Sequence, residues 1–318
     1  MGAPLFKDML KDSPKNWGKW GPDDEIGSLN YLGTAEALAG AAEIRSGKSF
    51  TLAVPMGSPG GDPMWPGREA PKRVNVIDHG TWVAGKGFPI PGEAEYADDM
   101  LVMYVQGSSQ YDALGHVWHD NTLWNGFSAD ETVGGLTKAS ILPIAEHGIV
   151  GRGVLIDIAG YRGKPCLDPG ETFTHEDLLA AAAAQGVEIK KRDILLIHTG
   201  WIDSYYAGDS EKFKRQPFME PGLTYSPELV TWFQEMEIPN LVTDTIANEV
   251  TIEPNTGTSL PLHQALMRNL GVLFTEIISL AALAADCRAD GQYAFLYTAA
   301  PLKLVQGTGA PVNPVVVK

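Results

Sequence analysis

The second half of the chain alternates short apolar runs with helical segments, and this alternation limits the fold more than any other feature. The runs Val150–Ile158, Asp193–His198 and Leu241–Thr243 have the length and composition of buried strands. Phe50–Val54 and Leu101–Val105 have the same character in the first half, which is otherwise rich in loops. Strands that alternate with helices are typical of mixed folds. We therefore predict an α/β domain that combines a mixed sheet with helices.

Capping signals support the helical segments. The segment His175–Gln185 follows Thr174, a good N-cap residue, and stops at Gly186. Three further helical segments are expected, at Ser226–Glu235, Leu262–Leu270 and Ser279–Ala285.

Composition and charge exclude several classes of partner. The chain has 318 residues and a formal net charge of −15, which argues against nucleic acid or an anionic membrane as a partner. No apolar stretch approaches the roughly eighteen residues of a membrane span, and the N-terminus lacks the apolar core of a signal peptide. The two cysteines, Cys166 and Cys287, form no paired motif. We expect a cytoplasmic protein with reduced thiols.

Proline and glycine are dense between Pro55 and Pro91. Such a segment predicts long, ordered loops between short strands, and we expect these loops to lie over a functional site. No repeat or charged linker divides the chain, so we expect a single domain.

The segment QGSSQYDALGH, from Gln106 to His116, is the first candidate site. It follows an expected strand, where side chains from a loop can converge. Asp112 and His116 could bind a metal or transfer protons. The structural alternative is that Asp112 caps a helix and His116 packs at a polar end.

The segment LPLHQALMRNLGVLFTEIISL, from Leu260 to Leu280, is the second candidate. Glu276 lies among apolar residues, where an unpaired carboxylate is costly, so it needs a cation, a hydrogen-bond network or a metal. His263 begins the preceding helical segment. A solvated Glu276 at the end of a strand or helix is the alternative.

The third candidate is DILLIHTGW, in which an apolar strand ends at His198 and Trp201 as at the rim of a pocket. The chain contains no GxGxxG, P-loop, HExxH or GxSxG motif. Dinucleotide binding, NTP hydrolysis, zinc proteolysis and the α/β-hydrolase mechanism are therefore disfavoured.

At these three segments the sequence resembles the cyclase family, which includes bacterial kynurenine formamidase and isatin hydrolase. The family signature is H-x-G-T-H-x-D-x-x-x-H, and the same frame here reads Q-G-S-S-Q-Y-D-A-L-G-H. Trp20–Leu32, Gly151–Ala159 and the C-terminal AAPLKLVQGTGAPVNPVVVK also resemble segments of longer members. The resemblance implies a swivelling β/β/α domain over residues 1–318, with residues 1–50 as an approximate N-terminal extension, and a homodimer or homotetramer.

The resemblance also implies roles for single residues. His116 corresponds to the acid–base or proton-shuttle position. Asp112 corresponds to a metal ligand and also forms a catalytic pair with His116. The ligand positions correspond to Gln106, Gln110, Asp112, His263 and Glu276. We expect the substrate pocket to be shaped by Trp118, His119, Trp124, His198 and Trp201.

Gln106 and Gln110 depart from the family signature because amides occupy both histidine positions. Imidazole suits zinc and other transition metals, whereas amide and carboxylate oxygens suit Mg²⁺ and Mn²⁺. We expect a divalent metal, with Mn²⁺ or Zn²⁺ ahead of Mg²⁺, or an empty site as the consequence of the two substitutions. The two glutamines therefore indicate a distinct branch of the family.

Three functional hypotheses follow. The first is a metal-dependent hydrolase that cleaves a C–N or C–O bond in a small cyclic or aromatic amide, lactone or ester. The second is a metal-free cyclase, dehydratase or lactonase that uses His116 and Asp112. The third is a non-catalytic protein that binds a small molecule on an inherited scaffold.

Overall fold

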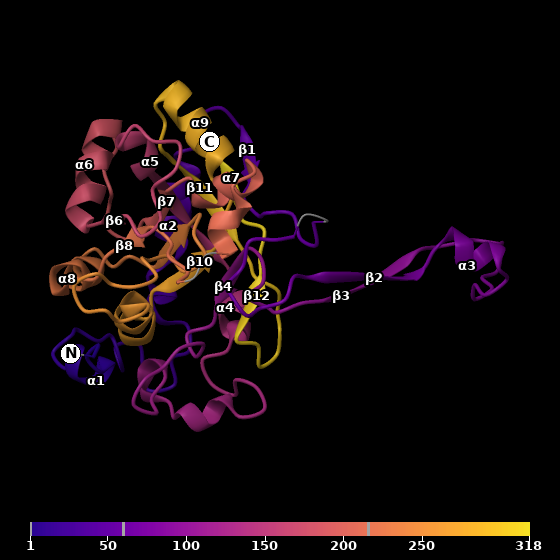
Figure 1. Cartoon of the computed structure of the whole chain (residues 1–318), viewed down its shortest axis with the longest axis horizontal. Coiled ribbons are helices and arrows are strands. Elements are labelled where there is room, and N and C mark those ends of the chain that lie inside the picture. The colour runs from indigo at the N-terminus through magenta and orange to yellow at the C-terminus, as the bar shows by residue number, and fades with distance from the viewer. Residues whose placement is uncertain (1, 59–60, 215–216) are drawn as a thin grey trace.

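The computed structural model describes residues 2–58, 61–214 and 217–318, and a mixed sheet of nine strands forms its centre (Figure 1). Strands β5, β7, β9 and β10 run parallel in the middle, and antiparallel strands flank them on both sides. In spatial order the strands are β1 (Ser49–Thr51), β13 (Val315–Val317), β11 (Ala294–Ala299), β5 (Ile149–Asp157), β7 (Ile194–His198), β9 (Asn240–Thr243), β10 (Leu273–Glu276), β4 (Gln110–Asp112) and β12 (Gly309–Pro311).

The central strands are apolar on both faces because both faces of the sheet are covered. Every residue of β7 and β9 is buried, as is every residue of β5 except Val150. Continuous apolar runs are typical of parallel strands in this position. The predictions of strands at Val150–Ile158, Asp193–His198 and Leu241–Thr243 are confirmed, with shifts of one residue at some ends.

The helices confirm the capping signals. Helix α6 has the predicted bounds, the Thr174 hydroxyl accepts from the backbone N–H of Asp177, and Gly186 ends the helix at φ 68°. The segment Leu262–Leu270 is helical as predicted, but its middle, η5 (His263–Arg268), is a π-helix. The α-helices are α1 (Phe6–Met9), α2 (Thr34–Ala41), α3 (His79–Val83), α4 (Ile141–His147), α5 (Ile158–Tyr161), α6 (His175–Gln185), α7 (Trp201–Tyr206), α8 (Pro227–Glu235) and α9 (Ala281–Asp290).

Short 3₁₀ helices and one small sheet complete the body of the molecule. The sheet pairs β6 (Thr172–Phe173) with β8 (Gly222–Leu223). The 3₁₀ helices are η1 (Gly27–Tyr31), η2 (Trp124–Gly126), η3 (Ala129–Thr132) and η4 (Ser210–Lys214). In the described part of the chain, no helix is long and apolar enough to cross a membrane.

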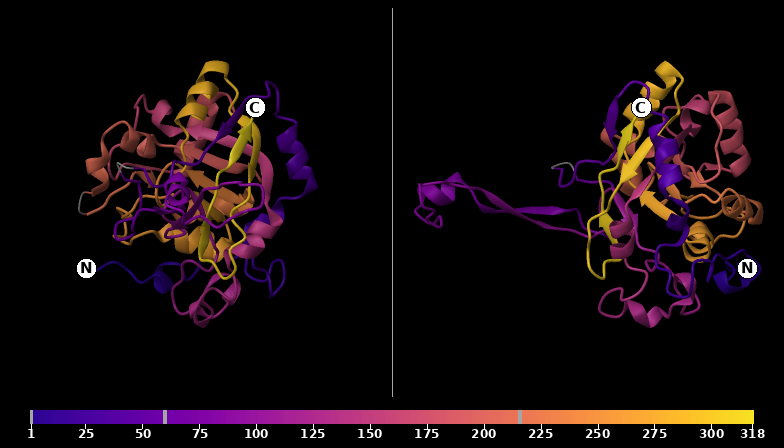
Figure 2. Two further views of the ribbon diagram at one scale, coloured as in Figure 1. Left: turned by 90° about the vertical axis from the view of Figure 1, so that its right-hand side faces the viewer. Right: turned by 180° about the vertical axis from the view of Figure 1, so that it is seen from behind.

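Two predictions for the first half are wrong. Leu101–Val105 is not a buried strand, because the strand there, β3 (Asp98–Val102), is exposed throughout and pairs only with β2 (Lys72–Ile77). The prediction of loops over a site at Pro55–Pro91 is wrong for residues 72–91, which contain β2 and α3 and extend away from the body (Figure 2, right). Residues 59–60 lie outside the described residues, whereas 55–58 and 61–71 are loops, and Arg68 there donates to the backbone carbonyl of Gln106 at 2.9 Å. Phe50–Val54 forms only the short edge strand β1.

Candidate metal centre

The carboxyl ends of the central parallel strands carry the ionisable side chains. Asp157 ends β5, His198 ends β7, Asp244 follows β9, and Glu276 ends β10. Ligands of α/β sheets commonly bind at this edge, since the loops that leave the strands converge there.

Three of the predicted residues form a group that could hold a metal. Potential ligand atoms of Asp112, His263 and Glu276 all lie within 4.8 Å of one another, and all three side chains are buried. Strand β4 supplies Asp112 and pairs antiparallel with β10, which supplies Glu276. His263 opens η5, so the sheet and one helix position the group together.

The imidazole of His263 is oriented by a buried carboxylate, Glu249. Nδ1 of His263 lies 2.7 Å from Oε1 of Glu249, and Nε2 lies 3.4 Å from Oε1 of Glu276. Burial lowers the pKa of His263, but the hydrogen bonds with Glu249 and Glu276 outweigh it and raise this pKa to about 10. A histidine that binds a metal through one nitrogen commonly donates its other N–H to a carboxylate in this way.

Unpaired oxygens beside these ligands fit a cation. Nε2 of Gln110 donates to Oε2 of Glu276 at 2.8 Å, and Nδ2 of Asn248 donates to Oε1 of Glu276 at 3.3 Å. These contacts leave Oε1 of Gln110 and Oδ1 of Asn248 buried, and within the described residues neither oxygen has a hydrogen-bond donor. Oδ1 of Asp112 is also buried and has no hydrogen-bond donor among the described residues. Buried acceptors without partners are costly, so a bound cation would stabilise all three.

The electrostatics and the backbone at this group also indicate a functional site. Burial raises the pKa of Asp112 to about 6, because a carboxylate without water around it is disfavoured. Ile277, directly after Glu276, has φ 58°, which is a strained conformation for a β-branched residue. Such strain concentrates at functional sites, where it directs side chains.

Gln106 takes a different position from Gln110. Its Nε2 lies 3.0 Å from Oγ1 of Thr308 and 3.4 Å from Nδ1 of His116. The Thr308 hydroxyl can donate as well as accept, so the amide of Gln106 fits beside the ring in either orientation. If the amide oxygen of Gln106 faces the ring, Nδ1–H of His116 donates to that oxygen. Nε2 of His116 is then free to accept a proton. Burial lowers the pKa of His116, which favours this neutral form.

The five predicted pocket residues lie in different environments. Trp118 is exposed, and Nδ1 of His119 contacts Oε1 of Gln264 at 2.7 Å. Trp124 and Trp201 are fully buried. Trp124 packs in the main core beside Trp20, and Trp201 packs in a smaller apolar cluster that includes Ile277.

His198 belongs to a separate ionic network. Its Nδ1 lies 2.7 Å from Oδ1 of Asp157 and its Nε2 lies 3.0 Å from Oδ2 of Asp203. Burial lowers the pKa of His198, but these carboxylates and Asp244 raise it to about 10, so the ring is a cation at neutral pH. Potential ligand atoms of His198, Asp203 and Asp244 also lie within 4.8 Å of one another. Among the described residues, however, no buried oxygen of this network lacks a hydrogen-bond partner, in contrast to the oxygens beside Asp112. We therefore assign this network a structural role.

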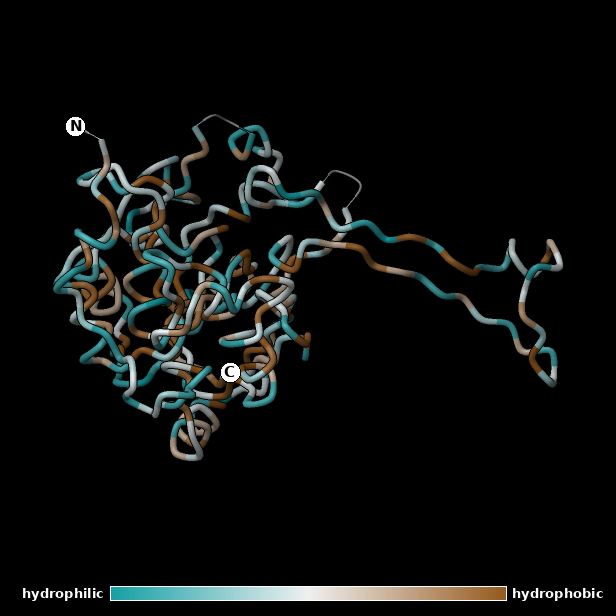
Figure 3. Tube along the Cα trace, turned by 90° about the horizontal axis from the view of Figure 1, so that it is seen from below, coloured by the Kyte–Doolittle hydropathy of each residue, from teal (hydrophilic) through white to brown (hydrophobic). Residues whose placement is uncertain are grey.

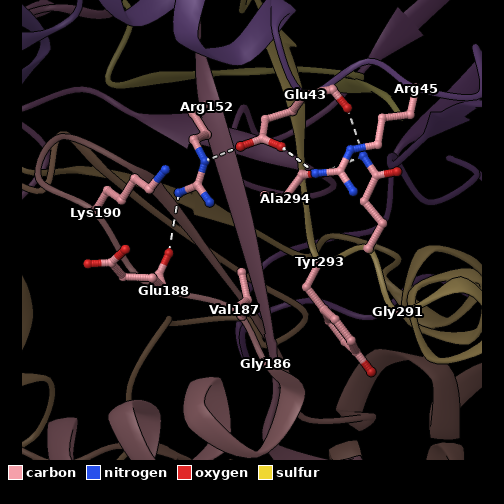
Figure 4. Close-up of a pocket in the computed structure, with 11 residues that line it drawn as sticks. Glu43, Arg45, Arg152, Gly186, Val187, Glu188, Lys190, Gly291, Tyr293 and Ala294 are labelled. Atoms are coloured by element: carbon pink, nitrogen blue, oxygen red, sulfur yellow. Dashed lines mark hydrogen bonds and ion pairs between the residues drawn. The ribbon is translucent and has the colours of Figure 1, made fainter.

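A pocket of about 290 Å³ lies at the other end of the sheet (Figure 4). It includes Lys190, which precedes β7, whereas the candidate ligands lie at the carboxyl ends of the strands. Arg152 in this pocket is paired with Glu43 at 2.7 Å and with Asp193. Its charge is therefore already neutralised, and the pocket takes no part in the candidate centre.

Sequence reasoning missed Glu249 and Asn248. Both lie in the segment TDTIANEVTIE after β9, a polar stretch without a recognisable metal motif. The sequence feature that could have identified them is their position after a buried parallel strand, where polar residues often reach a functional site.

Comparisons with known proteins agree with this architecture. The Cyclase family model matches residues 50–250. A crystal structure described as a novel cyclase is 37% identical, with a TM-score of 0.86, and covers 96% of this chain and 100% of its own. Isatin hydrolase A from Ralstonia solanacearum is 19% identical, with a TM-score of 0.61, over 90% of this chain and 98% of its own. Isatin hydrolase A from Labrenzia aggregata, bound to benzyl benzoate, is 18% identical, with a TM-score of 0.58, over 91% of this chain and 98% of its own.

No curated protein matches the chain. The structural matches confirm the predicted cyclase-type α/β fold. The family model covers more than half of the chain, and the 37% identical structure covers nearly all of it. The chain therefore belongs to the cyclase family of enzymes.

Proposed function

We propose that the chain is a metal-dependent hydrolase that cleaves a C–N or C–O bond in a small cyclic or aromatic amide, lactone or ester. The convergence of Asp112, His263 and Glu276 within 4.8 Å carries the proposal. The similarity of the fold to isatin hydrolases supports the choice of substrate class.

The donor set favours Mn²⁺. His263 offers the one imidazole nitrogen of the group, and Asp112 and Glu276 offer carboxylate oxygens. The free amide oxygens of Gln110 and Asn248 add hard, neutral donors beside them. Oxygen-rich sets suit Mn²⁺ and Mg²⁺, and an imidazole favours Mn²⁺ of the two. We therefore rank Mn²⁺ first, and the glutamines account for a lower preference for Zn²⁺.

The residues of the chain would divide the chemistry between them. A bound divalent metal would polarise the substrate carbonyl and acidify a water molecule. His116, held by Gln106, would accept a proton from this water at Nε2 and return it to the leaving nitrogen or oxygen. Glu249 would fix the ring of His263, and Gln110 and Asn248 would fix the carboxylate of Glu276.

Turnover before and after chelation tests the proposal. The purified chain would be assayed against an aromatic formamide, a cyclic amide, a lactone and a cyclic imide, then treated with chelator and resupplied with Mn²⁺, Zn²⁺ or Mg²⁺. We expect hydrolysis of at least one compound, its loss on chelation, and recovery that is strongest with Mn²⁺.

Two results would contradict it. Turnover by metal-free protein that chelator leaves unchanged would support acid–base catalysis by His116 and Asp112 alone. Thermal stabilisation by a compound that metal-loaded protein never converts would indicate a binding protein.

Replacing Glu249 by glutamine should weaken metal binding. The variant keeps the shape of the side chain but loses the negative charge that orients and polarises His263. Loss of such a partner typically lowers metal affinity about 10- to 100-fold, and titration calorimetry with Mn²⁺ measures the change.

Glu253→Gln is the matched control. Glu253 is also fully buried, but its carboxylate accepts from Thr224, Tyr225 and Asn255. Its replacement should leave the affinity for Mn²⁺ unchanged. Equal affinities of the Glu249→Gln variant and the wild type would show that Glu249 does not support a metal ligand.

A further inference from the structure

A loop of residues 61–71 joins the body to the arm, which is the ribbon of β2 and β3 with its tip (residues 72–102). Figure 3 shows the two strands of the arm leaving the body. The loop also contacts the candidate centre, because Nη1 of Arg68 donates to the backbone carbonyl of Gln106 at 2.9 Å. The amide of Gln106 lies beside the ring of His116. The loop therefore brings a cationic side chain to the residues that hold the candidate base.

The loop is fixed by contacts of its own. The Asp62 carboxylate accepts from two backbone N–H groups of the preceding segment. The ring of Trp65 packs edge to face against Phe218, with the ring centroids 5.5 Å apart, and contacts the apolar cluster that contains Ile277. Because Ile277 directly follows Glu276, this packing attaches the loop to the strand that supplies a candidate metal ligand.

The guanidinium of Arg68 has no carboxylate to neutralise it. Among the described residues, its side chain forms no ion pair and its one hydrogen bond is the contact with Gln106. The acidic residues of the loop are engaged elsewhere, since Asp62 accepts from backbone N–H groups and Glu69 pairs with Lys72. The side chain of Arg68 is only partly buried, so its remaining N–H groups are open to a ligand.

The lack of an ion pair distinguishes Arg68 from most arginines in the described part of the chain. Arg268 also has no ion pair, but it donates to two backbone carbonyls and to the side chain of Asn269. The others pair with carboxylates: Arg45, Arg73, Arg152, Arg162, Arg192 and Arg288. Carboxylates are abundant in this chain of net charge −15, so a cation without one beside the candidate centre points to a ligand.

The charge of Arg68 acts on the two residues expected to carry out acid–base chemistry. Burial raises the pKa of Asp112 to about 6, and the cation of Arg68 opposes this rise. Burial lowers the pKa of His116, and Arg68 lowers it further because an imidazolium beside another cation is disfavoured. A negative group bound to Arg68 would therefore lie within electrostatic reach of both side chains.

We propose that Arg68 is a specificity-determining residue, which binds a carboxylate of the substrate close to the bond that is cleaved. The inference rests on the proposed hydrolase function and narrows its substrates to amides, lactones or esters with an anionic group near the reacting carbonyl. Guanidinium and carboxylate groups are planar partners that form paired, charge-assisted hydrogen bonds.

An aromatic carboxylate suits the loop. The backbone N–H of Arg68 donates to the carbonyl of Trp65 at 3.1 Å, so the two residues share a turn. The ring of Trp65 is partly buried and offers an aromatic surface in the same turn as the cation. The substrate class that follows is an aromatic amide or ester with a carboxylate on or beside the ring.

A monoanion suits the site better than a dianion such as inorganic phosphate. The carboxylates of Asp112 and Glu276 belong to the candidate centre, and that of Glu249 contacts its histidine. Charges of the same sign repel strongly where water is excluded, so each further negative charge is costly there. One carboxylate carries a single charge, which Arg68 alone can neutralise.

Binding to metal-free protein separates Arg68 from the metal. Benzoate and benzamide have nearly the same shape and differ in charge, and treatment with chelator removes any metal that could hold benzoate. We expect titration calorimetry to show binding of benzoate at least about tenfold tighter than that of benzamide. Arg68→Gln should lower the affinity for benzoate about 10- to 100-fold, which is the effect of losing a charged hydrogen bond.

Two further variants serve as controls for this loss. Arg68→Lys keeps the positive charge and should keep most of the affinity for benzoate. Arg73→Gln removes an arginine of β2 that pairs with Asp99 and should leave the affinity unchanged. Melting temperatures close to that of the wild type would show that all three variants are folded.

Turnover of a matched pair of formamides by Mn²⁺-loaded protein tests specificity itself. We expect the wild type to have a kcat/KM at least about tenfold higher for 2-formamidobenzoate than for 2-formamidobenzamide. Arg68→Gln should raise KM for the carboxylate and leave kcat/KM for the neutral compound nearly unchanged. A purely structural role, in which Arg68 only holds the carbonyl of Gln106, would lower the turnover of both compounds equally.

Each outcome separates this inference from the proposed hydrolase function. Equal binding of benzoate and benzamide, equal loss of both formamides in Arg68→Gln, or tighter binding of inorganic phosphate than of benzoate would overturn the carboxylate site and leave the hydrolase standing. Binding of benzoate that depends on Arg68, without turnover of either formamide, would support the carboxylate site and count against the hydrolase.

Discussion

Replacing Asp112 by asparagine should remove metal-dependent turnover and leave the chain folded. Asparagine has nearly the same shape but offers no negative charge, so the group would keep Glu276 as its only carboxylate. Loss of an outer partner of a metal ligand already costs about 10- to 100-fold in activity or affinity, so loss of a ligand should cost more. Steady-state kcat/KM at saturating Mn²⁺ measures the effect.

Stability separates this loss from unfolding. In chelator, the Asp112→Asn variant should melt at a temperature at least as high as the wild type, because it no longer buries a carboxylate whose pKa burial has raised to about 6. Asp193→Asn is the matched control. Burial raises the pKa of Asp193 to about 6 as well, but this residue pairs with Arg152 away from the centre. Full activity of Asp112→Asn, or equal loss in Asp193→Asn, would contradict the assignment.

Replacing His116 by glutamine should lower kcat about 10²- to 10⁴-fold, the usual contribution of a general acid–base group. The metal content should not change, because His116 is not part of the ligand group. His147→Gln removes an exposed histidine and serves as the control. A variant that loses its metal together with its activity would place His116 among the ligands.

The pH profile of the wild type should carry the signature of this base. Burial lowers the pKa of His116 below its ordinary value of about 6.5. The ring therefore stays neutral as the pH falls through 6.5, and activity should decline only on further acidification. The acid limb of kcat/KM should be absent or displaced in His116→Gln, and an acid limb unchanged by the substitution would exclude His116 as its source.

The central strands and capped helices could be predicted because their signals are local. An apolar run such as Asp193–His198 and a helix between Thr174 and Gly186 carry their bounds in neighbouring residues. The arm could not be predicted in this way. Val102 and its neighbours have the composition of a buried strand, but burial depends on what covers a strand and not on its own residues.

The candidate centre was predictable only in part for a related reason. Glu276 was conspicuous because a carboxylate among apolar residues needs a partner, and the structure places His263 and Asp112 beside it. Glu249 and Asn248 reach the group through tertiary contacts across the end of the sheet. The different contacts of Gln106 and Gln110 likewise depend on Thr308 and Glu276, both of which are distant in the sequence.

Metal content is the most direct test of the central claim, that Asp112, His263 and Glu276 hold a divalent cation. Wild-type and Asp112→Asn proteins would be purified without added metal, loaded with Mn²⁺, dialysed together and analysed by mass spectrometry. The account predicts about one ion for each wild-type chain and almost none for the variant, since the carboxylate is required for binding. A wild type that retains no metal, or a variant that retains the same amount, would contradict it.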